Sequence, residues 1–441
     1  MVNLTKREQA RGLRNVSHLV RRFMHVNWTM ADQAVVSGVN FLTGLVLARC
    51  LGISEFGIFS LTWVVVLFVF SLQYAMVSAP MLSIATKIED GGRPTYFGSV
   101  VLQHVLFTAV SAILVWLGVT TSGHVFPDLG LDSYALPLMA TTVAFQTRDF
   151  LRRMFYASDR HVAAFLLDVV GYGGQLAALV AMFVIGTLDI ISALWTIAAI
   201  SSLAIVGAAF GIGRLRFCPR DFVAVARRHW QFSRWLAASA LSNLFVDHFL
   251  LVLSGAFIGP AAAGAMKAAQ NLMGIAQLMF FALENIVPAR AAWHFHNGGI
   301  DALTEFMKRV TNWSVAATAL VVTLFATHPE FWLQLIFGDE FVGYGILVRL
   351  YGACFLLKSF GFAFVAGLHA LEDTRPIFVA CCSAAALAFA VTYPLLAQFG
   401  VTGAAAGAVI VEALVVSSII SGFLVRAQRL RRRHVVGTVS S

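Results

Sequence analysis

The sequence predicts an all-α polytopic membrane protein with about twelve transmembrane helices, arranged as two parallel, pseudo-symmetric six-helix bundles around a central cavity. Three observations predict this fold. The composition is strongly apolar, with 59% hydrophobic and only 12% charged residues, whereas a soluble protein carries roughly 25% charged residues. Apolar runs long enough to cross a bilayer recur along the chain. The basic residues between these runs alternate from one connection to the next, as the topology of a membrane protein requires.

The chain begins with a basic, amphipathic leader in residues 1–30. Hydrophobic residues, among them Val16, Val20 and Phe23, recur there at helical spacing beside basic residues such as Arg11. A helix with this composition lies along the membrane surface. We therefore expect a cytoplasmic interfacial segment before the first span.

The apolar runs predict six spans in each half of the chain, because a helix crosses the bilayer with about 20 apolar residues. The first bundle covers 31–212, a cytoplasmic linker 213–234, the second bundle 235–425 and a basic cytoplasmic tail 426–441. The expected spans are 31–51, 56–79, 98–119, 134–156, 161–186, 190–212, 235–258, 263–287, 311–328, 344–368, 376–397 and 402–425.

The lysines and arginines predict the orientation. With the N-terminus in the cytoplasm, 27 of the 31 basic residues fall on the cytoplasmic side, as the positive-inside rule requires. The outer connections carry acidic residues instead, such as Glu55, Asp189 and Glu330. Both termini are therefore expected in the cytoplasm. These connections also account for the net charge of +9, and no basic soluble domain that would bind nucleic acid is visible.

Two short stretches with the same glycine spacing follow the first and the seventh span. One contains Gly52 and Gly57, and the other contains Gly259 and Gly264. We interpret them as corresponding hairpin turns, because six spans separate them and each half then begins on the cytoplasmic side. This arrangement is a parallel repeat about an axis along the membrane normal.

The same stretches resemble a known family. ARCLGISEFGIFSL, at 48–61, resembles the first-hairpin signature of the polysaccharide transporter family, in which Arg-x-Leu-Gly precedes two variable residues, an acidic residue, an aromatic residue and Gly. Residues 243–272 resemble the seventh and eighth helices of that family, and NIVPARAAWH, at 285–294, resembles the end of the eighth. Ala265 and Met266 stand where the family commonly has an aromatic residue.

This family belongs to the multidrug/oligosaccharidyl-lipid/polysaccharide exporter superfamily. The resemblance covers about 30–425. It implies a flippase that moves an undecaprenyl-pyrophosphate-linked oligosaccharide across the bacterial inner membrane by alternating access, for O-antigen, capsule or exopolysaccharide synthesis. The implied partners are this lipid-linked oligosaccharide and membrane lipids, with a polysaccharide polymerase and a chain-length regulator as further candidates. No nucleic acid and no cofactor are expected.

Four basic residues lie outside the cytoplasmic segments, and we expect them to bind substrate. They are Arg49, Lys267, Arg349 and Lys358. Charged groups at membrane depth cost roughly 2.5–3.5 kcal/mol each, so they usually face a protein interior or a wet cavity. A cationic cavity of this kind suits a pyrophosphate. Two alternatives stay open: Arg49 and Lys267 reach the outer headgroups, or Lys358 forms an internal ion pair.

Three acidic residues lie within apolar helices, and we expect them either to couple transport to a cation or to form structural ion pairs. These residues are Asp247, Glu284 and Glu412, and Asp247 is a candidate partner for Lys267. Asp168 is placed near a cytoplasmic helix end. No P-loop, catalytic constellation or metal-ligand spacing is visible. The sequence therefore predicts a protein that is not an enzyme, with no catalytic residue and no metal site.

Two rival functions stay open. A cation-coupled multidrug or organic-cation antiporter of the same superfamily would have a cavity dominated by carboxylates, whereas the intramembrane charges here are more often basic. A membrane-embedded glycosyl polymerase or ligase would carry its reacting groups on a sizeable periplasmic loop, and the predicted topology has only short outer connections.

Overall fold

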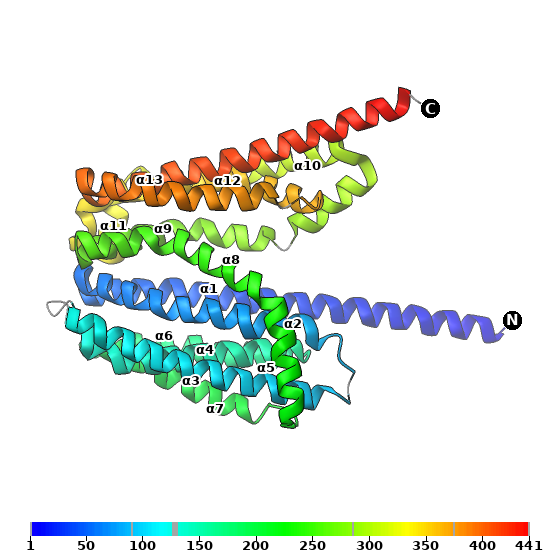
Figure 1. Cartoon of the computed structure of the whole chain (residues 1–441), viewed down its shortest axis with the longest axis horizontal. Coiled ribbons are helices and arrows are strands. Elements are labelled where there is room, and N and C mark those ends of the chain that lie inside the picture. The colour runs from blue at the N-terminus through cyan, green and yellow to red at the C-terminus, as the bar shows by residue number, and fades with distance from the viewer. Residues whose placement is uncertain (1, 90, 126–130, 285, 374, 440–441) are drawn as a thin grey trace. The chain divides into compact units, whose positions relative to one another are not determined.

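The structure is a computed structural model, drawn in Figure 1, that describes every residue of the chain except 1, 90, 126–130, 285, 374 and 440–441. The backbone alone is described for 2–34, 124, 125, 131, 243, 245–247, 278, 281, 282, 284 and 433–439. The described residues form helices and short connections, with no β-strand among them. They divide into two compact units, which we call unit 1 (1–43 and 66–238) and unit 2 (44–65 and 239–441).

Unit 1 is a helical bundle whose central helix is α4. Phe150 and Met154 of α4 lie in one buried apolar cluster with Met81, Val100 and Leu167 from neighbouring helices. The elements of unit 1 are both ends of α1 (Val2–Gln73), the π-helical η1 (Tyr74–Ser78), α2 (Ala79–Ala85), α3 (Arg93–Val125), the 3-10 helix η3 (Leu131–Tyr134), α4 (Ala135–Ala157), α5 (His161–Asp168), the π-helical η4 (Val169–Gly173), α6 (Gly174–Ile185), α7 (Ile190–Ala209) and the first part of α8 (Pro219–Phe257).

Local sequence explains how α6 ends and α7 begins. Gly186 has φ of 77°, the left-handed conformation that closes a helix and that glycine adopts without strain. Asp189 then caps α7, since its carboxylate accepts a hydrogen bond from the Ser192 backbone at 2.7 Å while its own backbone N–H donates to the Ser192 hydroxyl at 2.8 Å. The bond from the Ser192 backbone holds the pKa of Asp189 below its usual value.

Unit 2 has a core formed by α10, α12 and α13, which run alongside one another from yellow-green to red in Figure 1. Leu303, Met307, Leu368 and Phe423 are buried together there. The elements of unit 2 are the central part of α1, the rest of α8, α9 (Pro260–Glu284), α10 (Val287–Ala326), α11 (Pro329–Phe337), the 3-10 helix η5 (Asp339–Tyr344), α12 (Gly345–Ala370) and α13 (Arg375–Val439).

Three glycines interrupt the longest helices. Gly52 in α1, Gly299 in α10 and Gly400 in α13 have φ of 74°, 65° and 60°, so the chain turns at each of them. The stretches Val35–Ala85 and Arg375–Arg432 are apolar and have 51 and 58 residues, far more than the roughly 20 residues that one crossing needs. Each stretch therefore supplies two spans.

The predicted spans fall on helices over almost their whole length, but several helices extend well beyond them: α8 begins 16 residues before the span expected at 235–258, and α10 begins 24 residues before the span expected at 311–328. The span expected at 134–156 is α4, and the span expected at 190–212 is α7. The predicted linker at 213–234 is largely helical, because α8 begins at Pro219.

The two predicted hairpin turns pack against each other within unit 2. The first glycine of each pair turns the chain, with φ of 74° at Gly52 and 123° at Gly259. The second glycine of each pair permits a backbone contact. A Cβ atom on Gly57 would lie 1.8 Å from the Pro260 carbonyl oxygen, and a Cβ atom on Gly264 would lie 2.0 Å from the Ile53 carbonyl oxygen. The contact is reciprocal, because Pro260 lies four residues before Gly264 and Ile53 lies four residues before Gly57.

Candidate functional site

Arg49 lies at the hairpin of α1, where its exposed side chain contacts the end of α11. Its Nη1 donates a hydrogen bond to the Leu335 carbonyl at 2.5 Å, and carbonyl oxygens near a helix C-terminus carry partial negative charge. A second bond holds the same hairpin, because the Ile53 backbone N–H donates to Glu340 Oε2 at 2.8 Å. The Arg49 guanidinium is therefore anchored on one side and open to solvent or ligand on the other.

Lys267 begins a polar patch on one face of α9, which continues with two amide side chains. The residues one turn further along are Gln270, which donates to the Tyr351 hydroxyl at 2.9 Å, and Asn271, whose amide would lie 2.7 Å from a Cβ atom on Gly44. Lys267 itself is partly buried and forms no ion pair with any described side chain. It is therefore a cation within unit 2 whose charge no described carboxylate balances.

Of the three predicted acidic residues, the structure describes the side chain of Glu412 alone. The side chains of Asp247 and Glu284 lie outside the described residues, so a pair between Asp247 and Lys267 stays a prediction. Glu412 of α13 is described, and its Oε2 lies 4.0 Å from Lys358 Nζ of α12. This distance fits the internal ion pair that the sequence left open for Lys358, although 43% of the Lys358 side chain is exposed.

Arg349 caps the end of α10. Its Nε donates to the Ala326 carbonyl at 3.2 Å, and its Nη2 lies 3.8 Å from Glu330 Oε1 with both side chains 48% exposed. Arg49 thus contacts the last turn of α11, whereas Arg349 contacts the end of α10 and the first turn of α11. No contact within the described residues joins any two of the four predicted cations, which places them as separate positive charges along unit 2.

Unit 1 contains a buried charge cluster that the sequence analysis missed. Arg153 donates to Asp149 at 2.6 Å, and Arg152 donates to Asp168 at 2.9 Å and approaches Asp149 at 3.5 Å. Arg148 is the third guanidinium of the cluster, and both it and Asp168 are 1% exposed. The sequence analysis counted these arginines among the cytoplasmic basic residues and placed Asp168 near a cytoplasmic helix end. The structure adds that Arg148 and Asp168 are buried in the bundle and that Arg152 and Arg153 are partly buried there.

Two tyrosines on π-helical segments hold the arginines of this cluster. The Arg148 guanidinium lies 4.0 Å from the Tyr172 ring in η4, and Arg153 lies 4.3 Å from the Tyr74 ring in η1, which are favourable cation–π distances. Gly171 leaves the room that Arg148 needs, because a Cβ atom there would lie 2.7 Å from the guanidinium. Three described guanidiniums face two described carboxylates, so the cluster has an excess of positive charge.

The sequence did contain a signal for this cluster. The run RDFLRR at 148–153 places charges at i and i+4, and it lies inside the apolar span predicted at 134–156. Charges at this spacing share one face of a helix, which favours a position toward other helices. The carboxylate from α5 could not be assigned to the same cluster without the tertiary structure.

His229 connects the first turns of α8 to α3 within unit 1. It is buried, and its Nε2 lies 3.0 Å from the Tyr96 hydroxyl of α3. Burial, with a smaller contribution from Arg228, lowers the pKa of His229 to about 4. The ring is therefore neutral near pH 7, and its role is to position the predicted linker.

No family model matches the chain, and no curated protein does. Solved structures do match it. A multidrug resistance MATE family transporter of the MOP superfamily, in its inward-facing conformation, aligns over 91% of this chain and 96% of its own with a TM-score of 0.75 and 12% identity. The chain has the fold of a MOP superfamily transporter. This fold has twelve helices in two lobes, so the predicted all-α, twelve-helix class is confirmed.

Two further matches show how widely this fold is used. The lipid II flippase MurJ, in an inward closed conformation, aligns over 95% of this chain and 93% of its own with a TM-score of 0.64 and 11% identity. A MOP superfamily transporter from Pyrococcus furiosus, reported for the reverse polarity of its binding pocket, aligns over 93% and 96% with a TM-score of 0.60 and 13% identity. The chain is thus a multi-pass membrane protein, and these neighbours are transporters and a flippase rather than enzymes.

Proposed function

We propose that this protein is a flippase that moves an undecaprenyl-pyrophosphate-linked oligosaccharide from the cytoplasmic to the periplasmic leaflet of the bacterial inner membrane by alternating access. The observation that carries the proposal is Lys267, a partly buried cation with no described counter-ion on a polar patch of α9. A buried charge without a partner is costly, and an anionic group of a substrate would supply the missing charge. The fold that the chain shares with a lipid II flippase supports a lipid-linked substrate.

The four cations suit different roles toward a pyrophosphate. Lys267 supplies a compact charge from a partly buried position. Arg49 is anchored through a backbone carbonyl, which leaves its other guanidinium nitrogens to bind phosphate oxygens in the bidentate manner of arginine. Arg349 is held by the Ala326 carbonyl and by Glu330, so a phosphate competes with that carboxylate for it. Lys358 is held loosely by Glu412 at 4.0 Å, so a phosphate can compete for it. The sugar and the prenyl chain need no charged contact.

The proposal is tested by charge removal at Lys267. We expect Lys267→Met to abolish complementation of a strain that lacks its own lipid-linked-oligosaccharide flippase, and Lys267→Arg to keep part of the activity because it keeps the charge. Lys308→Met is the matched control, since Lys308 is an exposed cation on α10 and should leave complementation unchanged. Membrane abundance is measured for every variant. Full activity of both Lys267→Met and Lys358→Met would exclude the proposed cationic site.

Export of organic cations coupled to an ion gradient is a second candidate function. The likeness to a MATE family multidrug transporter favours it. The excess of arginines over carboxylates in the buried cluster of unit 1 does not, because a cationic drug is repelled by positive charge. Efflux of a cationic dye from cells that overproduce the protein separates the two candidates. We expect no increase in efflux, and an increase that depends on Asp247 or Glu284 would support the antiporter.

Several finer expectations belong to this proposal. Both termini face the cytoplasm if the basic residues follow the positive-inside rule, and a polysaccharide polymerase and a chain-length regulator are candidate partners. Accessibility of single cysteines introduced at the two termini tests the orientation. Labelling of either terminus from the periplasm of intact cells would contradict it.

A further inference from the structure

The first turns of α8 lie beside the helices of unit 1, near the end where α2 stops and α3 begins (Figure 1). The Arg216 backbone N–H, just before α8, donates to the Pro94 carbonyl of α3 at 3.0 Å. Ser233 Oγ lies 3.5 Å from the Met76 carbonyl, and Met76 precedes the end of α2 at Ala85 by nine residues, roughly 13 Å of helix. This part of α8 therefore runs alongside the bundle rather than on top of it.

The chain topology places the same part of α8 at a membrane surface. The helix α7, at Ile190–Ala209, is long and apolar enough to cross a bilayer, and α8 continues into the apolar stretch His248–Phe257. A segment that joins two membrane helices leaves the hydrocarbon between them. The stretch 210–235 therefore lies at the level of the headgroups.

One face of this part of α8 is covered by unit 1. Val225, His229 and Ser233 follow one another at intervals of four residues, which places them on one side of the helix. Val225 packs on the buried apolar cluster that contains Phe97, and His229 and Ser233 are 0% and 1% exposed. This packing and the bond from His229 to Tyr96 fix the rotation of the helix, so its other faces point away from unit 1.

A second face of the same helix combines arginines with apolar side chains. Its residues recur at intervals of three and four and are all exposed: Arg220, Val223, Arg227, Trp230 and Arg234. The two apolar residues, each 57% exposed, distinguish this face from one that meets only water. Tryptophan between arginines is typical of a helix at the boundary between headgroups and acyl chains.

The arginines of this face have no counter-ion in the part of the chain that the structure describes. None of Arg220, Arg227 and Arg234 forms an ion pair with a described carboxylate, and the stretch 214–234 has six arginines and a single acidic residue. In contrast, the stretch 301–309 of α10 has two basic and two acidic residues, and Arg309 lies 3.6 Å from Glu305. The arginine face is therefore a concentrated positive charge, which phosphate groups can neutralise through bidentate hydrogen bonds.

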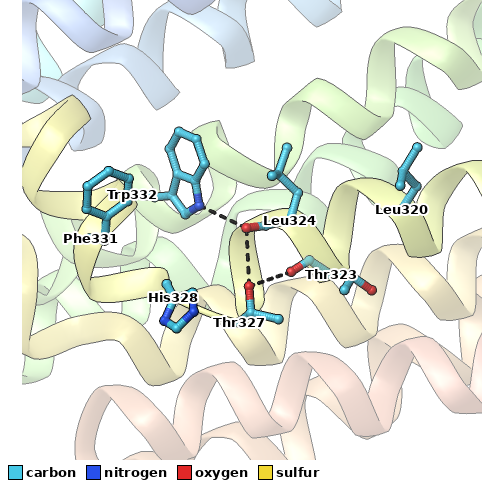
Figure 2. Close-up of a pocket in the computed structure, with 7 residues that line it drawn as sticks. All are labelled: Leu320, Thr323, Leu324, Thr327, His328, Phe331 and Trp332. Atoms are coloured by element: carbon cyan, nitrogen blue, oxygen red, sulfur yellow. Dashed lines mark hydrogen bonds between the residues drawn. The ribbon is translucent and has the colours of Figure 1, made fainter.

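The apolar pocket between the end of α10 and α11 lacks such a charge. Leu320 and Leu324 line it from α10, and Phe331 and Trp332 line it from α11 (Figure 2). None of the residues that line it is a lysine or an arginine. Apolar walls do not distinguish an anionic lipid from a zwitterionic one, so this pocket is an internal comparison for the arginine face.

We propose that the arginine face of α8 binds anionic phospholipids of the surrounding bilayer. The guanidiniums of Arg220, Arg227 and Arg234 contact phosphate groups, and the Trp230 ring lies among the upper carbons of the acyl chains. The position of the face between two membrane helices favours a lipid over a soluble polyanion. The site contains none of the four cations of the proposed transport function and does not depend on that function.

Photolabelling of the full chain in nanodiscs tests this site. Two photoreactive lipids are compared, phosphatidylglycerol and phosphatidylcholine, with the same acyl chains and a diazirine at the same carbon. We expect phosphatidylglycerol to label 214–235 about tenfold more than phosphatidylcholine does, because each basic residue near an anionic surface strengthens binding about fivefold. The two lipids should label 301–309 and 320–332 equally, and the preference at 214–235 should fall at high salt.

Paired variants assign the preference to these arginines. Arg227→Gln/Arg234→Gln should bring the labelling of 214–235 by the two lipids close to equality. Lys308→Gln/Arg309→Gln removes the same number of exposed charges from α10 and should leave the preference unchanged. Trp230→Ala should lower the labelling of 214–235 by both lipids. The melting temperature should stay the same in all three variants, because every substituted side chain is exposed.

Equal labelling of 214–235 by the two lipids in the natural protein would overturn the proposal, as would a preference that survives in Arg227→Gln/Arg234→Gln. Loss of the label when undecaprenyl phosphate is added at one-tenth of the phospholipid concentration would assign the face to a transported lipid. Displacement by inorganic phosphate but not by sodium chloride of the same ionic strength would assign it to a soluble phosphate compound, and cross-links from 214–235 to another polypeptide would assign it to a protein. Each of these three results would also overturn the proposal.

Discussion

The glycine contact between the two hairpins makes a quantitative prediction. A Cβ atom on Gly57 would lie 1.8 Å from the Pro260 carbonyl oxygen, whereas nonbonded heavy atoms pack at about 3.5–4.0 Å. In Gly57→Ala the two backbones must therefore separate by about 1.5–2 Å. That movement lengthens the 2.8 Å bond between Ile53 and Glu340 and loosens Phe56 against Phe341, whose ring centroids are 6.4 Å apart.

The expected cost combines two effects. Overpacking costs about 1–3 kcal/mol, and weakening a hydrogen bond to a carboxylate adds about 1 kcal/mol or more. We expect Gly57→Ala to lower the stability of unit 2 by about 2–4 kcal/mol. For a unit of this size, the thermal midpoint should fall by about 5–15 °C. Gly264→Ala should behave in the same way because the contact is reciprocal, and the double variant should cost less than the sum of the two.

Thermal unfolding of the purified protein in detergent measures this effect. The control is Gly274→Ala in α9, where a Cβ atom would meet nothing within 4 Å. Alanine is favoured over glycine in a helix by roughly 0.5–1 kcal/mol, so this variant should be as stable as the natural protein or more stable. The close contact would be refuted if Gly57→Ala melted at the same temperature as Gly274→Ala.

Three further predictions concern unit 1. Gly171→Ala should cost about 1–3 kcal/mol by displacing the Arg148 guanidinium, and almost nothing in an Arg148→Ala background; equal costs in both backgrounds would contradict this contact. The pKa of His229 falls from 6.5 to about 4 on folding, so an unfolded chain binds this proton more readily. The free energy that the neutral His229 ring contributes to folding is fully present above pH 6.5 and is lost as the pH falls toward 4, a change on the order of 3 kcal/mol. Melting curves of His229→Gln should lack this pH dependence. Asp189→Ala should cost about 1 kcal/mol near pH 7 through the lost cap of α7; no change in melting temperature would show that the cap contributes nothing.

The sequence alone determined the helical spans, because the length and period of an apolar run are local properties. The span predicted at 134–156 is the helix Ala135–Ala157. The spacing of Gly52 with Gly57 and of Gly259 with Gly264 was likewise visible, as was the resemblance to a transporter superfamily whose fold the chain has. None of these inferences requires residues that lie far apart in the chain to be placed together.

Only the tertiary structure decided which of these local features meet. It brought Gly57 against Pro260 and Gly264 against Ile53, and it paired Arg152 of α4 with Asp168 of α5. A sequence does not distinguish basic residues at a helix end that face the cytoplasm from those that face a buried carboxylate. The free-energy cost of burying such a residue depends on the partner that another helix supplies. Which charges pair and which stay unbalanced is therefore a property of packing between helices, and packing is not encoded in any single span.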